Sequence, residues 1–298
     1  MERVMKSEYE AAGYNMLGLK LKSPVIVGSG LISDQAKNIR QLLMCGAGAV
    51  VTKTIYPLSV KTHTERIYPI GTGLLNNTHY SKRTVDNWLD LLGQFHQQQL
   101  PIIASVHAPS PGETGLLVAA IRHISDCPLE LGISCLHADD FTEDNPERVY
   151  AYADAVRQQT DAKFSVKLSL GQYLHERVQA ACEGGASAIT LSDTIPGIAF
   201  DLVEGKAVLG GVCGYSGPGI KPLVLAAICE LRQRGVSVPI MGSGGVQSGL
   251  DVHEYMLAGA ETVQVYSALH QGMFTTLERI LEQYQSFCAR AQLTEVSQ

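Results

Sequence analysis

The chain has 298 residues, of which 45% are hydrophobic and 17% are charged, and its formal net charge is −6. This length suits one barrel of alternating strands and helices, since such barrels have roughly 250 residues before additions. The acidic balance and the lack of a basic cluster argue against nucleic acid or an anionic membrane as partner, because either would need Lys and Arg along one face. We therefore expect one domain over residues 1–298 that acts on a small molecule.

The cysteines and the hydropathy pattern narrow the class further. Seven cysteines are scattered along the chain without a Cys-x-x-Cys pair, which does not fit a disulfide scaffold, a zinc site or an iron–sulfur cluster. No apolar run reaches the about 18 residues of a membrane-spanning helix, and the first residues do not resemble a secretory or transit leader. We expect a cytoplasmic protein without a bound metal.

Short β-branched runs alternate with longer stretches of helical periodicity. The predicted strands cover residues 24–30, 48–54, 101–106, 129–134, 164–169, 187–193, 238–245 and 261–267. The predicted helices cover residues 37–45, 84–98, 146–159, 174–183, 223–234, 249–258 and 274–291. Apolar strands that alternate with helices indicate parallel strands buried on both faces, and eight such units close into a (β/α)8 TIM barrel. A doubly wound open sheet is the alternative.

Two additions to this barrel are expected. Residues 16–24 alternate apolar and polar side chains, which predicts a small N-terminal hairpin at the bottom of the barrel. Residues 196–222 are rich in glycine and predict an elaborated loop after the sixth strand.

In a barrel of this kind, chemistry gathers at the C-terminal ends of the strands. The residues at those ends are Gly28, Ser29, Thr52, Lys53, His107, Ser134, Cys135, Lys167, Ser192, Asp193, Thr194, Gly244, Gly245, Tyr266 and Ser267. The segment "MGSGGVQSG" has four glycines where a strand turns into a helix, and with the turn after the last strand it is typical of a phosphate site. A merely tight turn is the alternative.

Two lysines and one cysteine at these ends can carry chemistry. Lys53 and Lys167 each follow an apolar run, so each is a Schiff-base amine, a charge partner for an anionic ring, or a surface lysine. Cys135 can act as acid, base or nucleophile beside cationic groups. His137 is either its partner or an ordinary loop histidine.

Several fragments match one family together, in order and spacing. They are "LGLKLKSPVIVGSG", "GAGAVVTKT", "LELGISC", "VKLS", "SGPGIKPLVLAAI", "PIMGSGGVQSGLDVHEYMLAGAETVQV" and "SALHQG". Over roughly residues 16–291 the chain resembles the dihydroorotate dehydrogenases, in particular the soluble branch that uses a cysteine. The resemblance implies an FMN-containing barrel that removes two hydrogens across a C–C bond beside a carbonyl.

The resemblance also assigns roles to residues. It makes Cys135 the loop base, places Lys167 beside the flavin pyrimidine ring, and places Lys53 near both flavin and substrate. The positions that match the flavin-ring turn, the phosphate turns and the ribityl loop are Gly28, Ser29, Gly244, Gly245, Tyr266, Ser267, Ser216 and Gly217. Thr52 and Thr194, at the ends of their strands, are expected to join this cofactor site.

The chain departs from the family pattern at the positions that bind the substrate. The family pattern Asn-x-Ser-Cys-Pro-Asn reads "GISCLH" here, with Gly132 and His137 in place of the asparagines. The pattern Asn-Ser-Met-Gly-Leu-Pro-Asn reads "IGTGLLN", and an Asn-Ser/Thr pair reads "DT". The expected substrate-binding residues are Ile70, Asn76, Gly132, His137, Asp193 and Thr194. Glycine and isoleucine offer no side-chain hydrogen bond and an ionised Asp only accepts, so we expect a substrate other than dihydroorotate.

The sequence therefore predicts an FMN-dependent oxidoreductase with catalytic residues Cys135, Lys53 and His137. A flavin-free lyase or aldolase with Lys167 as Schiff-base amine is the chief alternative, and a non-catalytic flavin-binding subunit is the third. Because no cluster-binding cysteine set or second nucleotide motif is visible, we expect a diffusible redox partner or a separate electron-transfer partner. A homodimer is expected by analogy with the family.

Overall fold

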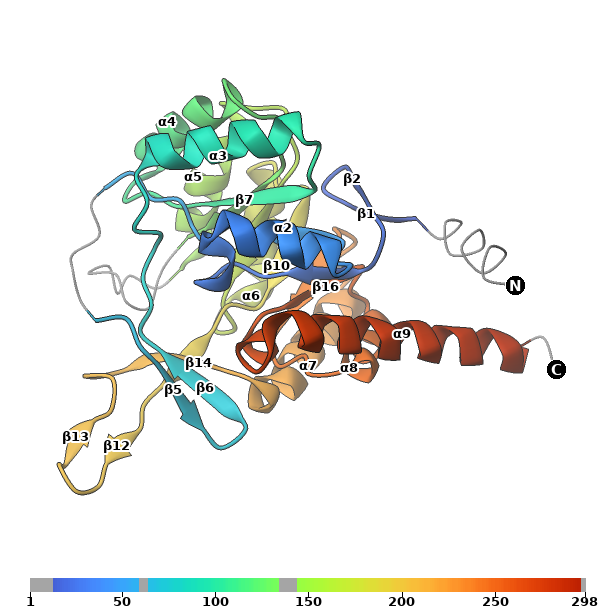
Figure 1. Cartoon of the computed structure of the whole chain (residues 1–298). Helices are drawn as coiled ribbons and strands as arrows, with labels where there is room; N and C mark the ends of the chain where they lie inside the picture. The colour runs from blue at the N-terminus through green and yellow to red at the C-terminus, as the bar shows by residue number, and fades with distance from the viewer. Residues whose placement is uncertain (1–12, 59–63, 134–143, 296–298) are drawn as a thin grey trace.

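The structure, a computed structural model, describes residues 13–58, 64–133 and 144–295, with side chains described to residue 290 (Figure 1). Eight parallel strands close into a barrel in the order β10-β15-β16-β3-β4-β7-β8-β9. They are β3 (Val25–Val27), β4 (Ala49–Val51), β7 (Ile102–Val106), β8 (Leu129–Gly132), β9 (Phe164–Leu168), β10 (Ala188–Leu191), β15 (Ile240–Ser243) and β16 (Thr262–Val265). The predicted (β/α)8 barrel is confirmed, and the open sheet is not what the chain forms.

Helices surround the barrel on its outside (Figure 1). They are α2 (Ala36–Met44), α3 (Val85–Gln97), α4 (Pro111–Arg122), α5 (Pro146–Arg157), α6 (Leu174–Glu183), α7 (Lys221–Gln233), α8 (Gly249–Ala258) and α9 (Met273–Glu295). Short 3-10 turns cover Ile32–Asp34, Pro218–Ile220 and Ser267–His270. No helix in the described part of the chain is long and apolar enough to cross a membrane.

Helix α4 is absent from the helices predicted above. Its start carries a strong local signal, because the Ser110 hydroxyl accepts from the backbone N–H of Glu113 and Pro111 fits the first turn. Its buried residues, Thr114, Gly115, Leu117, Val118 and Ile121, include two that are not hydrophobic in the usual sense. The apolar face of this helix is therefore weak in the sequence, whereas the capping residues at its start would have predicted it.

Alternation along the strands divides the apolar side chains between two sides. In β3, Val25 and Val27 pack with the surrounding helices, whereas Ile26 joins a separate cluster inside the barrel. That inner cluster is closed from below by the predicted hairpin, formed by β1 (Tyr14–Met16) and β2 (Leu19–Leu21). One end of the barrel is thus sealed by apolar side chains, and polar chemistry is left to the other end.

A second sheet lies at the open end of the barrel. Its strands are β5 (Ile67–Ile70), β6 (Gly73–Asn76), β11 (Ile195–Gly197) and β14 (Cys213–Ser216), all antiparallel in the order β11-β14-β6-β5. From it projects a hairpin of β12 (Phe200–Asp201) and β13 (Lys206–Ala207) (Figure 1). The glycine-rich segment after the sixth barrel strand is thus the expected elaborated loop. Its pairing with residues 67–76 was not predicted.

The close fit of this sheet depends on glycine. A side chain at Gly73 would place its Cβ 2.6 Å from Cε2 of Tyr215 on the neighbouring strand. Gly214 is equally crowded, with its Cβ 2.7 Å from the Thr194 hydroxyl. These contacts bring the sheet edge against the barrel rim, which positions Asn76 and Ser216 over the open end.

The start of α8 offers a test of local stability. The Ser248 hydroxyl accepts from the N–H of Asp251 at 3.3 Å, and the Asp251 carboxylate accepts from the N–H of Ser248 at 2.8 Å. Ser248→Ala removes this reciprocal cap and is expected to lower the free energy of unfolding by about 1 kcal/mol in urea titrations. Ser187→Ala, which removes a half-buried hydroxyl without a recorded hydrogen bond, is the matched control. Equal losses in both variants would contradict a capping role.

Candidate functional site

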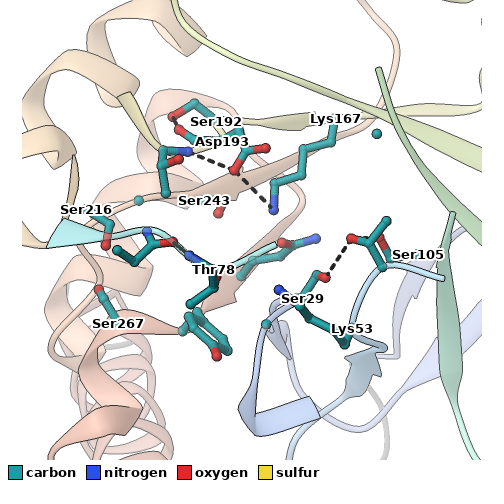
Figure 2. A pocket seen from close by; sticks show the side chains of 18 of the residues that line it. Ser29, Lys53, Thr78, Ser105, Lys167, Ser192, Asp193, Ser216, Ser243 and Ser267 are labelled. Carbon is teal, nitrogen blue, oxygen red and sulfur yellow. Dashed lines mark hydrogen bonds and ion pairs between the residues drawn. The ribbon is translucent and has the colours of Figure 1, made fainter. Parts of the chain in front are cut away.

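A cavity of about 210 Å³ opens at the C-terminal ends of the barrel strands, between the barrel and the second sheet (Figure 2). The predicted site residues that line it are Ser29, Lys53, Asn76, Gly132, Lys167, Asp193, Thr194, Ser216, Gly244, Gly245, Tyr266 and Ser267. They come from almost every strand of the barrel and from the second sheet. Residues far apart in the sequence are thus brought to one place.

The other predicted residues lie elsewhere. Thr52 is fully buried and its hydroxyl accepts from the N–H of Ser105 at 3.0 Å, so it supports the wall rather than lining it. Gly28 directly precedes Ser29 and Gly217 directly follows Ser216, and these two serines line the cavity. Ile70 packs against the cluster of Leu75, Leu209 and Cys213 instead. Cys135 and His137 lie outside the described residues.

The glycine turn after β15 presents unused backbone donors to the cavity. Gly244 and Gly245 have φ angles of 139° and 71°, which favour glycine. Among the described residues, the N–H groups of Gly245, Val246 and Ser267 have no recorded acceptor. A Cβ at Gly245 would lie 2.6 Å from the Gly217 carbonyl oxygen, so the cradle tolerates no side chain there. All three residues line the cavity, and backbone N–H groups left free in such a turn can bind an anion.

The neighbouring helix does not compete for this role. The N–H groups around the start of α8 are already bound: those of Gln247 and Ser248, just before the helix, donate to the Asp251 carboxylate at 2.8 Å, and that of Gly249 donates to Gln283 Oε1 at 3.1 Å. The Lys221 ammonium lies against the same carboxylate at 2.5 Å. The start of α8 is therefore neutralised by its own chain, and the anion site is confined to the glycine turn.

A lysine between two carboxylates forms the charged wall of the cavity. The Lys167 ammonium lies 3.8 Å from Glu130 Oε1 and 4.0 Å from Asp193 Oδ1, and Figure 2 shows it pointing toward Asp193. Burial by itself lowers the pKa of Lys167, but the charges of Asp193 and Glu130 outweigh it and the net pKa is raised. Lys167 is therefore held as a cation at neutral pH.

The opposite wall is built of hydroxyl groups around Lys53. The Thr54 hydroxyl lies 3.3 Å from that of Ser29 and 3.0 Å from that of Ser105, which makes a short chain of hydrogen bonds across three strand ends. Lys53 itself is buried and lines the same wall (Figure 2). Groups that both donate and accept are suited to the polar edge of a heterocyclic ring.

Gly132 leaves open space at the end of β8. Among the described residues, a Cβ added there would meet only the Val106 carbonyl oxygen, at 3.9 Å, so these residues leave room for a side chain. The Gly132 carbonyl oxygen lies 3.0 Å from His107 Nδ1, and since a carbonyl only accepts, that nitrogen carries the proton. The His107 ring stacks on Tyr80, with centroids 5.0 Å apart, and the two rings form an aromatic wall beside the space.

Tyr266 fixes the turn that carries Ser29. Its hydroxyl accepts from the N–H of Ile32 at 3.1 Å, and a Cβ at Gly30 would lie only 2.0 Å from its ring carbon Cζ. Burial raises the pKa of Tyr266, so the phenol stays neutral at physiological pH. Burial lowers the pKa of the neighbouring His270, whose ring meets Tyr266 edge-on.

Sequence reasoning missed two deep residues of the cavity, Glu130 and Gln264. Both lie inside apolar strand runs, and the sequence analysis gives neither a role. The signal in the sequence was the alternation of side chains along a strand. Glu130 is two residues before Gly132, and Gly132 pairs with Lys167 on the neighbouring strand. Alternate residues of a strand share one face, so Glu130 points into the barrel like the other site residues.

Comparison with known proteins agrees with this geometry. Residues 12–287 match the family model of dihydroorotate dehydrogenase. A relative from Pyrococcus abyssi, named dihydroorotate dehydrogenase B (NAD(+)), catalytic subunit, is 30% identical over 276 residues, covering 90% of this chain and 91% of its own. A relative of the same name from Methanosarcina acetivorans is 32% identical over 86% of this chain and 85% of its own. The resemblance carried by the motifs is confirmed, and with it FMN, on which this family depends.

Proposed function

Because the chain belongs to the dihydroorotate dehydrogenase family of FMN-dependent oxidoreductases, we propose that it transfers two hydrogens across a C–C bond beside a carbonyl or imine of a small molecule other than dihydroorotate. The observation that carries the proposal is an asymmetry within one cavity. The anion cradle and Lys167 suit the cofactor, whereas Gly132 and Asp193 stand where the family resemblance places substrate-reading asparagines. Both dehydrogenation and the reverse reduction are compatible with this arrangement.

The described residues fit FMN. The free N–H groups of Gly245 and Ser267 would hold the phosphate, Ser216 would lie along the ribityl chain, and Ser29 and Lys167 would face the ring. The cradle leaves no room for a side chain, as a site for a bulky oxyanion requires. When bound, FMN supplies the hydride acceptor or donor at N5.

The protein's own groups handle the proton. Cys135 comes three residues after Gly132 in the sequence, and Gly132, the last residue of β8, lines the cavity. We assign Cys135 the transfer of the proton at the carbon beside the carbonyl. Lys53 supplies a positive charge at the facing wall, where it would balance charge on the substrate. His137 would bind a substrate carboxylate or assist Cys135.

The substrate side argues for a different molecule. Each buried donor or acceptor that loses its partner costs about 1–3 kcal/mol, or roughly five- to more than a hundredfold in affinity. Gly132 contributes no side-chain partner, and the amide of Asn76 is already engaged with Gly214 and Thr78. Asp193 offers only acceptors, and one of its oxygens already takes the N–H of Thr194 at 2.8 Å. We infer a substrate with an amine or cationic group near Asp193 and a larger substituent near Gly132.

The rival mechanism is disfavoured by electrostatics. A Schiff-base lysine needs a lowered pKa, so that the free amine can attack a carbonyl. Asp193 and Glu130 raise the pKa of Lys167 instead. A non-catalytic flavin-binding subunit fits the cofactor side equally well, and turnover decides between it and the enzyme.

A redox partner completes the proposal. The relatives named above are called catalytic subunits of an NAD(+)-linked enzyme. We propose that this chain too exchanges electrons with a separate electron-transfer partner, and that it forms a homodimer in the cytoplasm. Copurification of a second flavoprotein or iron–sulfur protein would support the separate electron-transfer partner.

The cradle predicts a specific sensitivity of FMN binding. Gly245→Ala places a methyl group against the Gly217 carbonyl and forces a strained φ, so we expect at least a tenfold weaker FMN affinity by fluorescence titration. Gly211→Ala is the control, because a Cβ there meets nothing within 4 Å. An unchanged affinity in Gly245→Ala would remove the phosphate from this turn.

Cys135 predicts a loss of turnover without a loss of cofactor. Cys135→Ser and Cys135→Ala should keep the yellow FMN complex but lose roughly 10²–10⁴-fold in turnover, since general acid–base catalysis contributes about that much. The readout is the rate of flavin bleaching by substrates found in a screen. His137→Ala, compared in the same assay, separates substrate binding from proton transfer. Full turnover in Cys135→Ala would end this assignment.

The substrate side predicts inertness toward dihydroorotate. Anaerobic mixing of the wild-type protein with dihydroorotate should leave the flavin absorption oxidised, because its polar edges would lack partners. Restoring amides with Gly132→Asn and Asp193→Asn together should create measurable bleaching, since the described residues leave room for a side chain at residue 132. Turnover of dihydroorotate by the wild type at ordinary enzyme rates would refute the proposed change of substrate.

A further inference from the structure

We infer that Glu130 is a positioning residue, which holds one carboxylate oxygen toward Lys167 and thereby fixes the lysine as a cation directed into the cavity. The inference deepens the proposed function, since Lys167 is the residue expected beside the flavin ring. Neither the motifs nor the relatives single out Glu130. Its role follows from how its two oxygens are divided.

One oxygen of Glu130 is anchored and the other is left for the lysine. Oε2 accepts from the Thr190 hydroxyl at 2.8 Å and from the Gln264 amide at 2.5 Å. Oε1 has no hydrogen-bond partner among the described residues and lies 3.8 Å from the Lys167 ammonium. Because both donors bind the same oxygen, the carboxylate cannot rotate without losing them. Its orientation toward Lys167 is therefore set by the barrel itself.

Glu130 lies deep in the barrel and is paired with a lysine. Glu130 is 0% exposed, and a buried ionised group persists only if charge and hydrogen bonds compensate it. Thr190 and Gln264 donate hydrogen bonds but carry no charge. Lys167 is the cation recorded in an ion pair with it, so each charge needs the other.

Asp193 does not make Glu130 redundant. The side chain of Asp193 is 45% exposed, whereas that of Glu130 is 1% exposed. Water therefore screens the charge of Asp193, and its influence on the lysine weakens with salt. In the described part of the chain, the other ionisable groups that line the same cavity are Lys53, His79, His107, His270, Tyr80 and Tyr266. A positive charge on Lys53 or on a histidine only opposes protonation of Lys167. Glu130 is shielded from water, so its effect on the charge of Lys167 should not depend on salt.

The first experiment measures the titration of Lys167 directly. The full-length protein is labelled with trace acetic anhydride at a series of pH values, and acetylation of Lys167 is followed by mass spectrometry against the exposed Lys206. Glu130→Gln keeps the shape and can still accept from Thr190 and Gln264, but removes the charge. We expect the Lys167 profile to move to lower pH, with at least a tenfold faster relative labelling near pH 9, since one pKa unit is tenfold.

Two variants serve as controls for this shift. Asp193→Asn should also move the Lys167 profile, but its effect should shrink as salt is added, whereas that of Glu130→Gln should not, because only the Asp193 carboxylate is half exposed. Thr190→Val keeps the charge of Glu130 but removes the hydrogen bond from residue 190 to Oε2, so the Lys167 profile should move by less than in Glu130→Gln. An unmoved profile in Glu130→Gln, with Asp193→Asn giving the whole shift, would overturn the inference.

The second experiment is a double-mutant cycle on FMN affinity. In the wild-type background, Glu130→Gln should weaken FMN binding several-fold by releasing Lys167. In Lys167→Met, Glu130 is left as an unpaired negative charge near the flavin, so adding Glu130→Gln should strengthen binding or leave it unchanged. The same substitution should also raise the thermal midpoint of the Lys167→Met protein. An equal loss of affinity in both backgrounds would show that Glu130 acts independently of the lysine.

The two proposals fail in different ways. If the wild-type protein binds no FMN, the proposed function falls, while the labelling profile of Lys167 still decides the role of Glu130. If FMN binds but the profile does not move in Glu130→Gln, only the positioning role is lost.

Discussion

Closure of the barrel is the constraint on which the rest of the structure depends. Once eight parallel strands close, every second side chain points into a narrow interior from which water is excluded. Near the bottom this interior is filled by Ile26, Val51, Ile103 and Met241, and the N-terminal hairpin covers them. Polar side chains on the same inward parity can be satisfied only toward the open end. The cavity lies there because the strands leave no other place for it.

A closed interior also dictates how charge is arranged at the cavity floor. An isolated carboxylate would cost several kcal/mol to bury, so Glu130 occurs together with donors and a cation from neighbouring strands. The same pairing raises the pKa of Lys167, although burial alone lowers it. A requirement of folding thus sets the charge of Lys167, which faces the cavity.

Periodicity made most of the barrel predictable, because strands buried on both faces read as apolar runs and helices as amphipathic stretches. The second sheet was not predictable in this way. Its strand β6 pairs with β14, more than a hundred residues later, through short glycine-rich segments that carry no alternation. The same limit applies to Glu130, since a single charged residue in an apolar run reveals its role only when its neighbours across the barrel are known. The glycine turn and Lys167 were found because their motifs carry local chemistry.

The parts of the cavity proposed for cofactor and for substrate rest on different parts of the chain, which would let one change without the other. The cofactor half is made largely of backbone, where the φ angles of Gly244 and Gly245 and the packing on Gly217 leave no freedom. The substrate half is made of side chains at strand ends, and at Gly132 the described residues leave room for a side chain, since a Cβ meets none of their atoms closer than 3.9 Å. Substitutions in the substrate half therefore cost little folding stability and leave the cradle intact. A barrel with this division keeps its cofactor chemistry while the molecule it acts on is free to change.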